Sequence, residues 1–558
     1  MRVLLLKKSE RSHNNARMPI IILTTLYLLG NALLLLNRGV YWDGRYYFYL
    51  LEQSEWNVLW AHLTEVKLFS LYYVIRLVSL FPHPMLAIKM LAFFSWLIAG
   101  ILLFIILTKK IKLPAHHVFF ISSIFLLIPS FPIKAEFSVL YYSLCNMFFF
   151  IGAYIYFSSE GAHSAFVKYF GYLISGIFFF LSFFTNSFLV FYVGFLLITL
   201  WYQYKEQWLR KNAFFVALPI LFWALKISLG KPEVSYNEFV FLRADFLAGF
   251  IKNFWNGIAY GFFWPLVAPI TILQRKVFAG LFAIMLVIVY ALTKRFLRND
   301  NERDAEASEK YWRYVMAGTF LFFLGLAPYL AVGKAPSIFG PGFAMRHALL
   351  LPLGSAFIIL GVILSVIQEQ WQKTIQIIIL TLFCTFSIYT YFTLDMDWYK
   401  QKAIVKALAD APELLQTSTL IINDNVRGFE FQNRTILDFE YQTYVNEAFS
   451  QEHFKFVIRG NGNVDENNIN QMVQEKYLAF LDAEMFPVPP NFDPLTKPVS
   501  IEIVSRATEE IYTVPKWLRL KYYELFLNNA LFSQKLADEL QIVVQLPIVV
   551  SRKINVAN

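Results

Sequence analysis

The chain of 558 residues is 57% hydrophobic and only 16% charged, with 58 phenylalanines and a mean hydropathy of +0.49. Soluble domains are nearer half apolar and a quarter charged, so this composition excludes a series of soluble domains. The net charge of +10 does not predict nucleic-acid binding. Much of the lysine and arginine stands in short clusters between apolar runs, which is typical of cytoplasmic loops in membrane proteins.

Repeated apolar runs, matched in length to a hydrocarbon core of about 30 Å, predict a polytopic α-helical membrane protein with about 11 transmembrane helices. The expected spans are Met18–Asn37, Met85–Leu107, His116–Ile128, Phe137–Phe157, Tyr169–Phe184, Phe188–Trp201, Ala213–Leu229, Val277–Leu292, Trp312–Ala331, Ala348–Ile367 and Thr374–Leu394. The first run is too long for the core of a signal peptide and is interpreted as a retained span.

Basic clusters set the expected orientation. Lys7, Lys8, Arg11 and Arg17 precede the first span, so the N-terminus is expected in the cytoplasm. Everything after the last span is then extracytoplasmic, in a multi-pass protein of the plasma (inner) membrane. Both cysteines stand in apolar runs and indicate neither a compartment nor a metal site.

Two apolar segments do not fit this series of spans. Residues 68–81 are short and contain Arg76, and residues 257–273 are broken by Pro265 and Pro269. Counting either as a span would place basic loops outside, so both are interpreted as interfacial or re-entrant segments. They belong to predicted outer loops 38–84 and 230–275, and the sequence leaves open whether either one crosses the membrane.

The tail has the composition of a soluble protein. We therefore predict a transmembrane domain over residues 1–394 and a small α/β or α+β domain over residues 395–558 on the outer face. Expected strands are Ser418–Ile422, Phe454–Ile458, Val499–Val504 and Gln541–Val550, and expected helices are Gln401–Ala409 and Leu518–Leu527.

A cluster of polar and aromatic residues follows the first span. It contains Asp43 and Arg45 among Tyr41, Trp42, Tyr46 and Tyr47. Charges at membrane level are expensive and usually functional. The alternatives are that Asp43 caps a surface helix or pairs with Arg45, and that the rings form an interfacial aromatic belt.

Further charges fall on the same predicted face. Lys134 and Glu136 stand in the turn before the fourth span, and Lys334, Arg346 and His347 precede the tenth. Structural alternatives are that Glu136 complements a helix dipole, that Arg346 and His347 anchor a span, and that Lys334 is a solvated loop charge.

This combination resembles the GT-C superfamily of integral-membrane glycosyltransferases, which use polyprenyl-phosphate or polyprenyl-diphosphate sugars. The resemblance covers the architecture of the whole chain and rests on Asp43 in Trp42-Asp43-Gly44-Arg45, with Glu136 in the second outer turn. The paired acidic dipeptide that several members carry after the first span is absent here.

The resemblance implies an inverting transfer from a polyprenyl-phosphate sugar to a glycan, lipid or protein acceptor. Asp43 would be the general base, with Glu136 assisting or binding the acceptor. The positive groups of Arg45, Lys134, Lys334, Arg346 and His347 would hold the departing phosphate. Trp42 and Tyr46 would stack on the sugar or line the lipid entrance.

Other functions and a metal site are alternatives to this prediction. An envelope polysaccharide polymerase or ligase would carry a larger late loop, and a transporter or flippase would show charges within spans and an internal repeat. A non-catalytic scaffold is the remaining alternative. Asp395 and Asp397 form an Asp-x-Asp pair that can bind a divalent metal, but the pair is interpreted as the start of a helix. No cofactor is expected.

Overall fold

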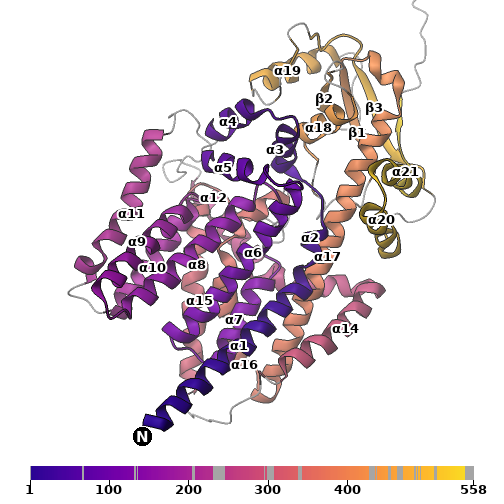
Figure 1. Ribbon diagram of the computed structural model, residues 1–558. Coiled ribbons are helices and arrows are strands. Elements are labelled where there is room, and N and C mark those ends of the chain that lie inside the picture. Colours follow the sequence, from indigo (N-terminus) through magenta and orange to yellow (C-terminus); the bar gives the residue numbers. More distant parts are fainter. Residues whose placement is uncertain are drawn as a thin grey trace, which may run out of the picture. The chain divides into compact units, whose positions relative to one another are not determined.

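The computed structural model of the chain is mostly helical, with one small sheet (Figure 1). It describes residues 2–546 apart from 66–67, 131–133, 135, 204–207, 230–245, 295, 298–306, 337–341, 427–433, 435, 450–453, 461–468, 483–485, 487, 490–491 and 508–511. Part of the predicted outer loop 230–275 therefore lies outside the described residues.

The chain divides into two compact units. Unit one comprises Met1–Arg38 and Trp60–Tyr391, and unit two comprises Gly39–Leu59 and Phe392–Asn558. The second segment of unit two begins at Phe392, close to the predicted domain boundary at residue 395. Unit two also takes in Gly39–Leu59, which the prediction assigned to an outer loop of the transmembrane domain, and Asp43 is part of this segment.

Unit one is a bundle of helices. In chain order the described helices are α1 (Arg2–Asn31), α2 (Leu33–Leu36), α4 (Trp56–Glu65), α5 (Phe69–Val78), α6 (Pro84–Ile105), η1 (Ile106–Lys110), α7 (Ala115–Leu127), α8 (Leu140–Glu160), α9 (Ala165–Ser182), α10 (Ser187–Gln203), α11 (Trp208–Leu229), α12 (Phe246–Ile258), η5 (Ala259–Phe263), α13 (Trp264–Thr271), η6 (Ile272–Gln274), α14 (Lys276–Thr293), α15 (Ala307–Leu330), η7 (Gly342–Ala348), α16 (Leu351–Val366) and α17 (Glu369–Ala409), with the start of α4 and the end of α17 in unit two.

Among the described residues, 7 helices are long and apolar enough to cross a membrane. Shorter apolar helices, such as α7 and α16, accompany them. The chain is therefore a polytopic helical protein, and the number of eleven spans stays a prediction.

Helices α15 and α16 pack very closely because glycines line their contact. A Cβ on Gly354 would lie 2.4 Å from the Phe322 nitrogen, and one on Gly318 would lie 2.6 Å from the Ile358 nitrogen. Small residues allow such close approach of apolar helices. The pairing is antiparallel, so the end of α15 and the start of α16 lie at the same end of the bundle.

The two ambiguous segments differ from each other in length. Helix α5 has 10 residues, which at 1.5 Å per residue is about half the hydrocarbon thickness. In the second half of α12, Asn253 donates to the Gly333 carbonyl just beyond the end of α15. After η6 the chain enters α14, and the carbonyl of Lys294, just beyond the end of α14, accepts from Lys373 at the opposite end of the bundle. These contacts favour a re-entrant path through α12, α13 and η6, although the segment is long enough to span.

Unit two is an α/β fold around a four-stranded sheet. Its helices are α3 (Trp42–Glu52), η8 (Pro412–Gln416), α18 (Asp438–Ala448), α19 (Ile469–Asp482), α20 (Val514–Phe526) and α21 (Asn529–Leu540), and its strands are β1 (Thr419–Asp424), β2 (Phe456–Arg459), β3 (Val499–Ser505) and β4 (Ile542–Gln545). The strand order is β2-β1-β3-β4, in which only the β3–β4 pair is antiparallel. Ile421 and Ile458 in the sheet pack against Val473 of α19.

Helix α17 corrects one expectation. The sequence predicted that the last span ends at Leu394 and that a separate helix covers Gln401–Ala409. The structure has one continuous helix from Glu369 to Ala409. The polar residues that suggested a break are buried in side-chain contacts of unit two, which are described below.

Candidate functional site

The predicted site residues divide between the two units. Trp42, Asp43, Arg45 and Tyr46 belong to unit two, whereas Lys134, Glu136, Lys334, Arg346 and His347 belong to unit one. Within unit one, the structure brings Lys334, Arg346 and His347 together. We call these three residues the cationic cluster.

A Schellman motif at the end of α15 positions Lys334. Gly333 has φ = 67°, and its N–H donates to the Leu330 carbonyl at 3.1 Å, while the Lys334 N–H donates to the Tyr329 carbonyl at 2.9 Å. This motif needs a left-handed residue, which glycine adopts without steric cost. The glycine therefore stops the helix and turns the chain so that Lys334 follows directly.

Arg346 and His347 come from the short helix η7 just before α16. Burial, with the neighbouring Arg346 charge, lowers the pKa of Lys334 to about 8. Burial and the same charge also lower the pKa of His347 to about 3. At neutral pH the cluster therefore holds two positive charges and a neutral imidazole, whose Nδ1 lies 3.4 Å from the Ala335 carbonyl oxygen. The Arg346 charge acts on both Lys334 and His347, which shows that the three side chains lie near one another.

Sequence reasoning missed the polar residues beside this cluster. The Tyr329 ring lies 5.1 Å from the His347 ring, and its hydroxyl donates to the Ser187 hydroxyl at 3.2 Å. The adjacent Asn186 accepts a hydrogen bond of 2.7 Å from Lys226. The Thr185-Asn186-Ser187 turn between two predicted spans was the available signal, since polar residues there need partners.

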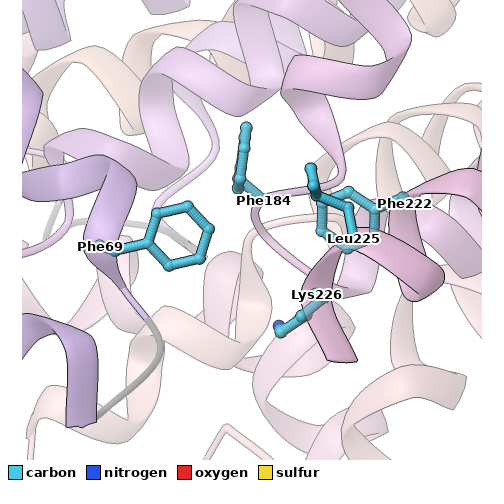
Figure 2. A pocket seen from close by; sticks show the side chains of 5 residues that line it. All are labelled: Phe69, Phe184, Phe222, Leu225 and Lys226. Carbon is cyan, nitrogen blue, oxygen red and sulfur yellow. The ribbon is translucent and has the colours of Figure 1, made fainter. Parts of the chain in front are cut away.

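Lys226 also borders a shallow aromatic pocket (Figure 2). Its volume is about 250 Å³ when the open space at its mouth is included. The lining combines one ammonium group with the apolar side chains of Phe69, Phe184, Phe222 and Leu225.

Lys134 and Glu136 have partners elsewhere in unit one. The Lys134 ammonium donates to the Leu126 carbonyl at 3.2 Å and lies over the rings of Tyr27 and Trp96. The buried Glu136 carboxylate accepts from the Ser138 N–H at 3.4 Å, just before α8 begins. These contacts favour the structural alternative for Glu136, a carboxylate near a helix N-terminus, and a structural role for Lys134.

Asp43 lies in the first turn of α3, whose start is unusual. The preceding Trp42 has φ = 46°, a left-handed conformation that is uncommon for a bulky residue. Its N–H donates to the Glu440 carboxylate at 3.1 Å, which helps to hold this conformation. Tyr41, Trp42 and Tyr46 are all nearly fully buried in unit two, so their rings form protein core and not an exposed aromatic belt.

Arg45 is engaged inside unit two. Its guanidinium forms an ion pair with Glu447, donates to Thr443 at 3.1 Å and lies over the Trp398 and Tyr444 rings. Burial would raise the pKa of Glu447, but Arg45 and Lys402 lower it below its ordinary value. Arg45 thus pairs with Glu447, 402 residues away, and this placement favours a structural role over phosphate binding.

The Asp-x-Asp pair of α17 also takes part in ion pairs. Asp397 receives two hydrogen bonds from Arg434, of 2.5 and 2.8 Å. Asp395 instead accepts from the Trp517 indole at 3.0 Å and pairs with Lys521. The two carboxylates therefore bind different partners. Among the described residues, no group of three or more candidate metal ligands occurs.

No protein-family model, curated protein or solved structure matches this chain. Membership of the GT-C superfamily therefore stays a prediction from the sequence.

Proposed function

We propose that this protein is a membrane glycosyltransferase that moves a sugar from a polyprenyl-phosphate donor to an acceptor hydroxyl on the extracytoplasmic face. The observation that carries the proposal is the cationic cluster. Lys334, Arg346 and His347 gather where α15 ends and α16 begins, at one end of a bundle of apolar helices. A phosphate carried by a membrane lipid is the anion that such a position would meet.

The cluster suits the departing group of this reaction. When the bond between the anomeric carbon and the phosphate oxygen breaks, negative charge grows on that oxygen. Preorganised positive groups stabilise such charge most strongly where water is excluded. Arg346 can bind two phosphate oxygens with its planar fork, and Lys334 adds a point charge. The neutral His347 can serve as a hydrogen-bond partner.

Asp43 is the proposed general base. The acceptor oxygen forms its bond to the anomeric carbon, its proton moves to the Asp43 carboxylate, and the lipid phosphate leaves with the bonding electrons. Asp43 is only half-buried, whereas Tyr41, Trp42 and Tyr46 beside it are nearly fully buried. The contact between Trp42 and Glu440 fixes the backbone directly before it.

The test is a transfer assay with full-length protein in membranes and labelled polyprenyl-phosphate sugars of several kinds. Asp43→Asn should lower kcat by about 10²–10⁴-fold, which is the usual contribution of a general base. Arg346→Gln should raise the KM for the donor and also lower kcat, since the cluster is expected to bind both donor and departing phosphate.

Two surface substitutions serve as matched controls. Asp410→Asn removes a carboxylate that is 57% exposed in unit two, and Arg313→Gln removes an exposed cation near the start of α15. Both should leave transfer unchanged. Full activity of Asp43→Asn would show that Asp43 is not the base, whereas an Arg346→Gln variant with unchanged kinetics would contradict the phosphate site.

A further inference from the structure

Helix α20 of unit two has an unusual distribution of side chains. Four large apolar residues, Leu518, Tyr522, Leu525 and Phe526, are exposed, with exposed fractions of 55%, 57%, 38% and 71%. Their spacing places them on one side of the helix. We call this side the α20 apolar face. An exposed apolar cluster of this kind usually marks an interaction site.

The opposite side of α20 carries charged residues, and these are buried. The Lys521 ammonium lies 3.1 Å from Asp395 and 2.7 Å from Glu524. The Tyr399 hydroxyl donates to Glu524 at 3.0 Å, and the Trp517 indole donates to Asp395. The buried side thus holds charged residues beside the apolar Trp517 and Leu520, while four further large apolar side chains stay exposed.

These contacts also fix the position of α20 along α17. Its partners Phe392, Asp395 and Tyr399 lie within two turns of Leu394, the last residue of the apolar run in the sequence. That run is long enough to cross the hydrocarbon core. With the span ending at Leu394, as the sequence predicts, the residues that hold α20 lie where α17 would pass from the apolar layer into the headgroup layer. Figure 1 shows α20 beside α17.

We propose that the α20 apolar face inserts into the interface of the lipid bilayer and anchors unit two to the membrane surface. Interfacial helices bury an apolar face by about 5–10 Å at the boundary between headgroups and acyl chains. Tyr522 and Phe526 are residue types that favour this layer. The proposal does not depend on the glycosyltransferase assignment.

The test places a fluorescent label at single positions of the full-length protein, in nanodiscs that hold one copy each. Leu518→Cys, Tyr522→Cys and Phe526→Cys carry the label on the α20 apolar face. Lys535→Cys and Asp538→Cys, at exposed positions of α21, are the controls. Cys145 and Cys384 are buried, and the labelling of unmodified protein gives their background.

Lipids with a quencher in the upper acyl chain should quench the three α20 labels several-fold more than the α21 labels. Aqueous iodide should show the reverse order. Phe526→Glu, which puts a charge on the same face, should reduce lipid quenching of a label at position 522. Such a reduction would show that the apolar face, and not the label, causes insertion.

Two results would overturn the proposal. Equal iodide quenching at all five positions would show that the face remains in water. Protection from iodide without lipid quenching would show that protein covers it, and a second copy is excluded in single-copy discs. Either result leaves transfer activity untouched, so failure here is separate from failure of the proposed function.

Discussion

At the scale of single residues, Arg434 joins distant segments of unit two. Its guanidinium binds Asp397 of α17 along one edge and Glu440 of α18 along another, and it lies over the Trp42 ring at 5.3 Å. All three charged side chains are fully buried. Because water cannot solvate them, both carboxylates depend on the one guanidinium.

Replacing Arg434 with methionine should destabilise unit two strongly. The substitution keeps much of the side-chain volume but leaves Asp397 and Glu440 buried without their cation. Breaking a buried ion pair in this way costs about 3–5 kcal/mol. Arg434→Lys should lie between wild type and Arg434→Met, since lysine keeps the charge but cannot fork onto two carboxylates. Denaturant unfolding of the purified protein in detergent measures the change.

The matched control for this prediction is Arg519→Met. Arg519 binds Glu539 through two hydrogen bonds of 2.9 Å, but it is 49% exposed, and surface pairs contribute at most about 1 kcal/mol. If Arg434→Met and Arg519→Met unfold at the same denaturant concentration, the buried network does not stabilise the fold.

At the scale of elements, the sequence predicted the helices and strands that depend on the pattern of neighbouring residues. Each of the four strands expected in the tail overlaps an observed strand, and the predicted helix Leu518–Leu527 overlaps α20. Short runs rich in valine and isoleucine indicate strands directly. The apolar runs likewise predicted most helices of unit one, because the period and length of such runs depend only on neighbouring residues.

Long-range contacts explain what the sequence could not predict. Trp42 meets Glu440, which is 398 residues away, so nothing near residue 42 shows that it belongs to unit two. The sequence around Asp395 resembled the end of a span because its partner Trp517 is 122 residues away, and Lys521 is also remote. Of the predicted site, the structure brings Lys334, Arg346 and His347 together, and it shows Arg45 and Lys134 in structural contacts.

The end of α15 offers a test at this scale. Gly333→Ala places a Cβ on a residue with φ = 67°, which costs roughly 1 kcal/mol. If the helix end shifts to relieve this strain, Lys334 moves with it, and the donor KM should rise. The control is Gly280→Ala in α14, where an added Cβ would meet nothing within 4 Å. Identical thermal stability and KM for the two variants would contradict a role for the Schellman motif.

At the scale of the whole molecule, unit two is assembled from two stretches that are far apart in sequence. Gly39–Leu59 follows α1 and α2, and Phe392–Asn558 begins within α17. Helix α3 contributes Trp42, Arg45 and Tyr46 to the interior of this unit. Unit two can therefore form only after Phe392–Asn558 has been made, when the early segment meets its partners on α18.

This arrangement predicts that residues 392–558 alone do not fold stably. The fragment lacks Tyr41, Trp42 and Tyr46, and burial of each large side chain contributes roughly 1.5–3 kcal/mol. Their sum approaches the 5–15 kcal/mol that typically stabilises a domain. Joining residues 39–59 to the fragment through a flexible linker should restore a cooperative thermal transition. Circular dichroism measures this transition, in mild detergent that covers the α20 apolar face.

The same fusion with Arg45→Ala should melt at a lower temperature, because Glu447 loses its buried partner. A fragment of residues 392–558 that melts as cooperatively as the fusion would show that α3 is an accessory to this unit and not part of its core.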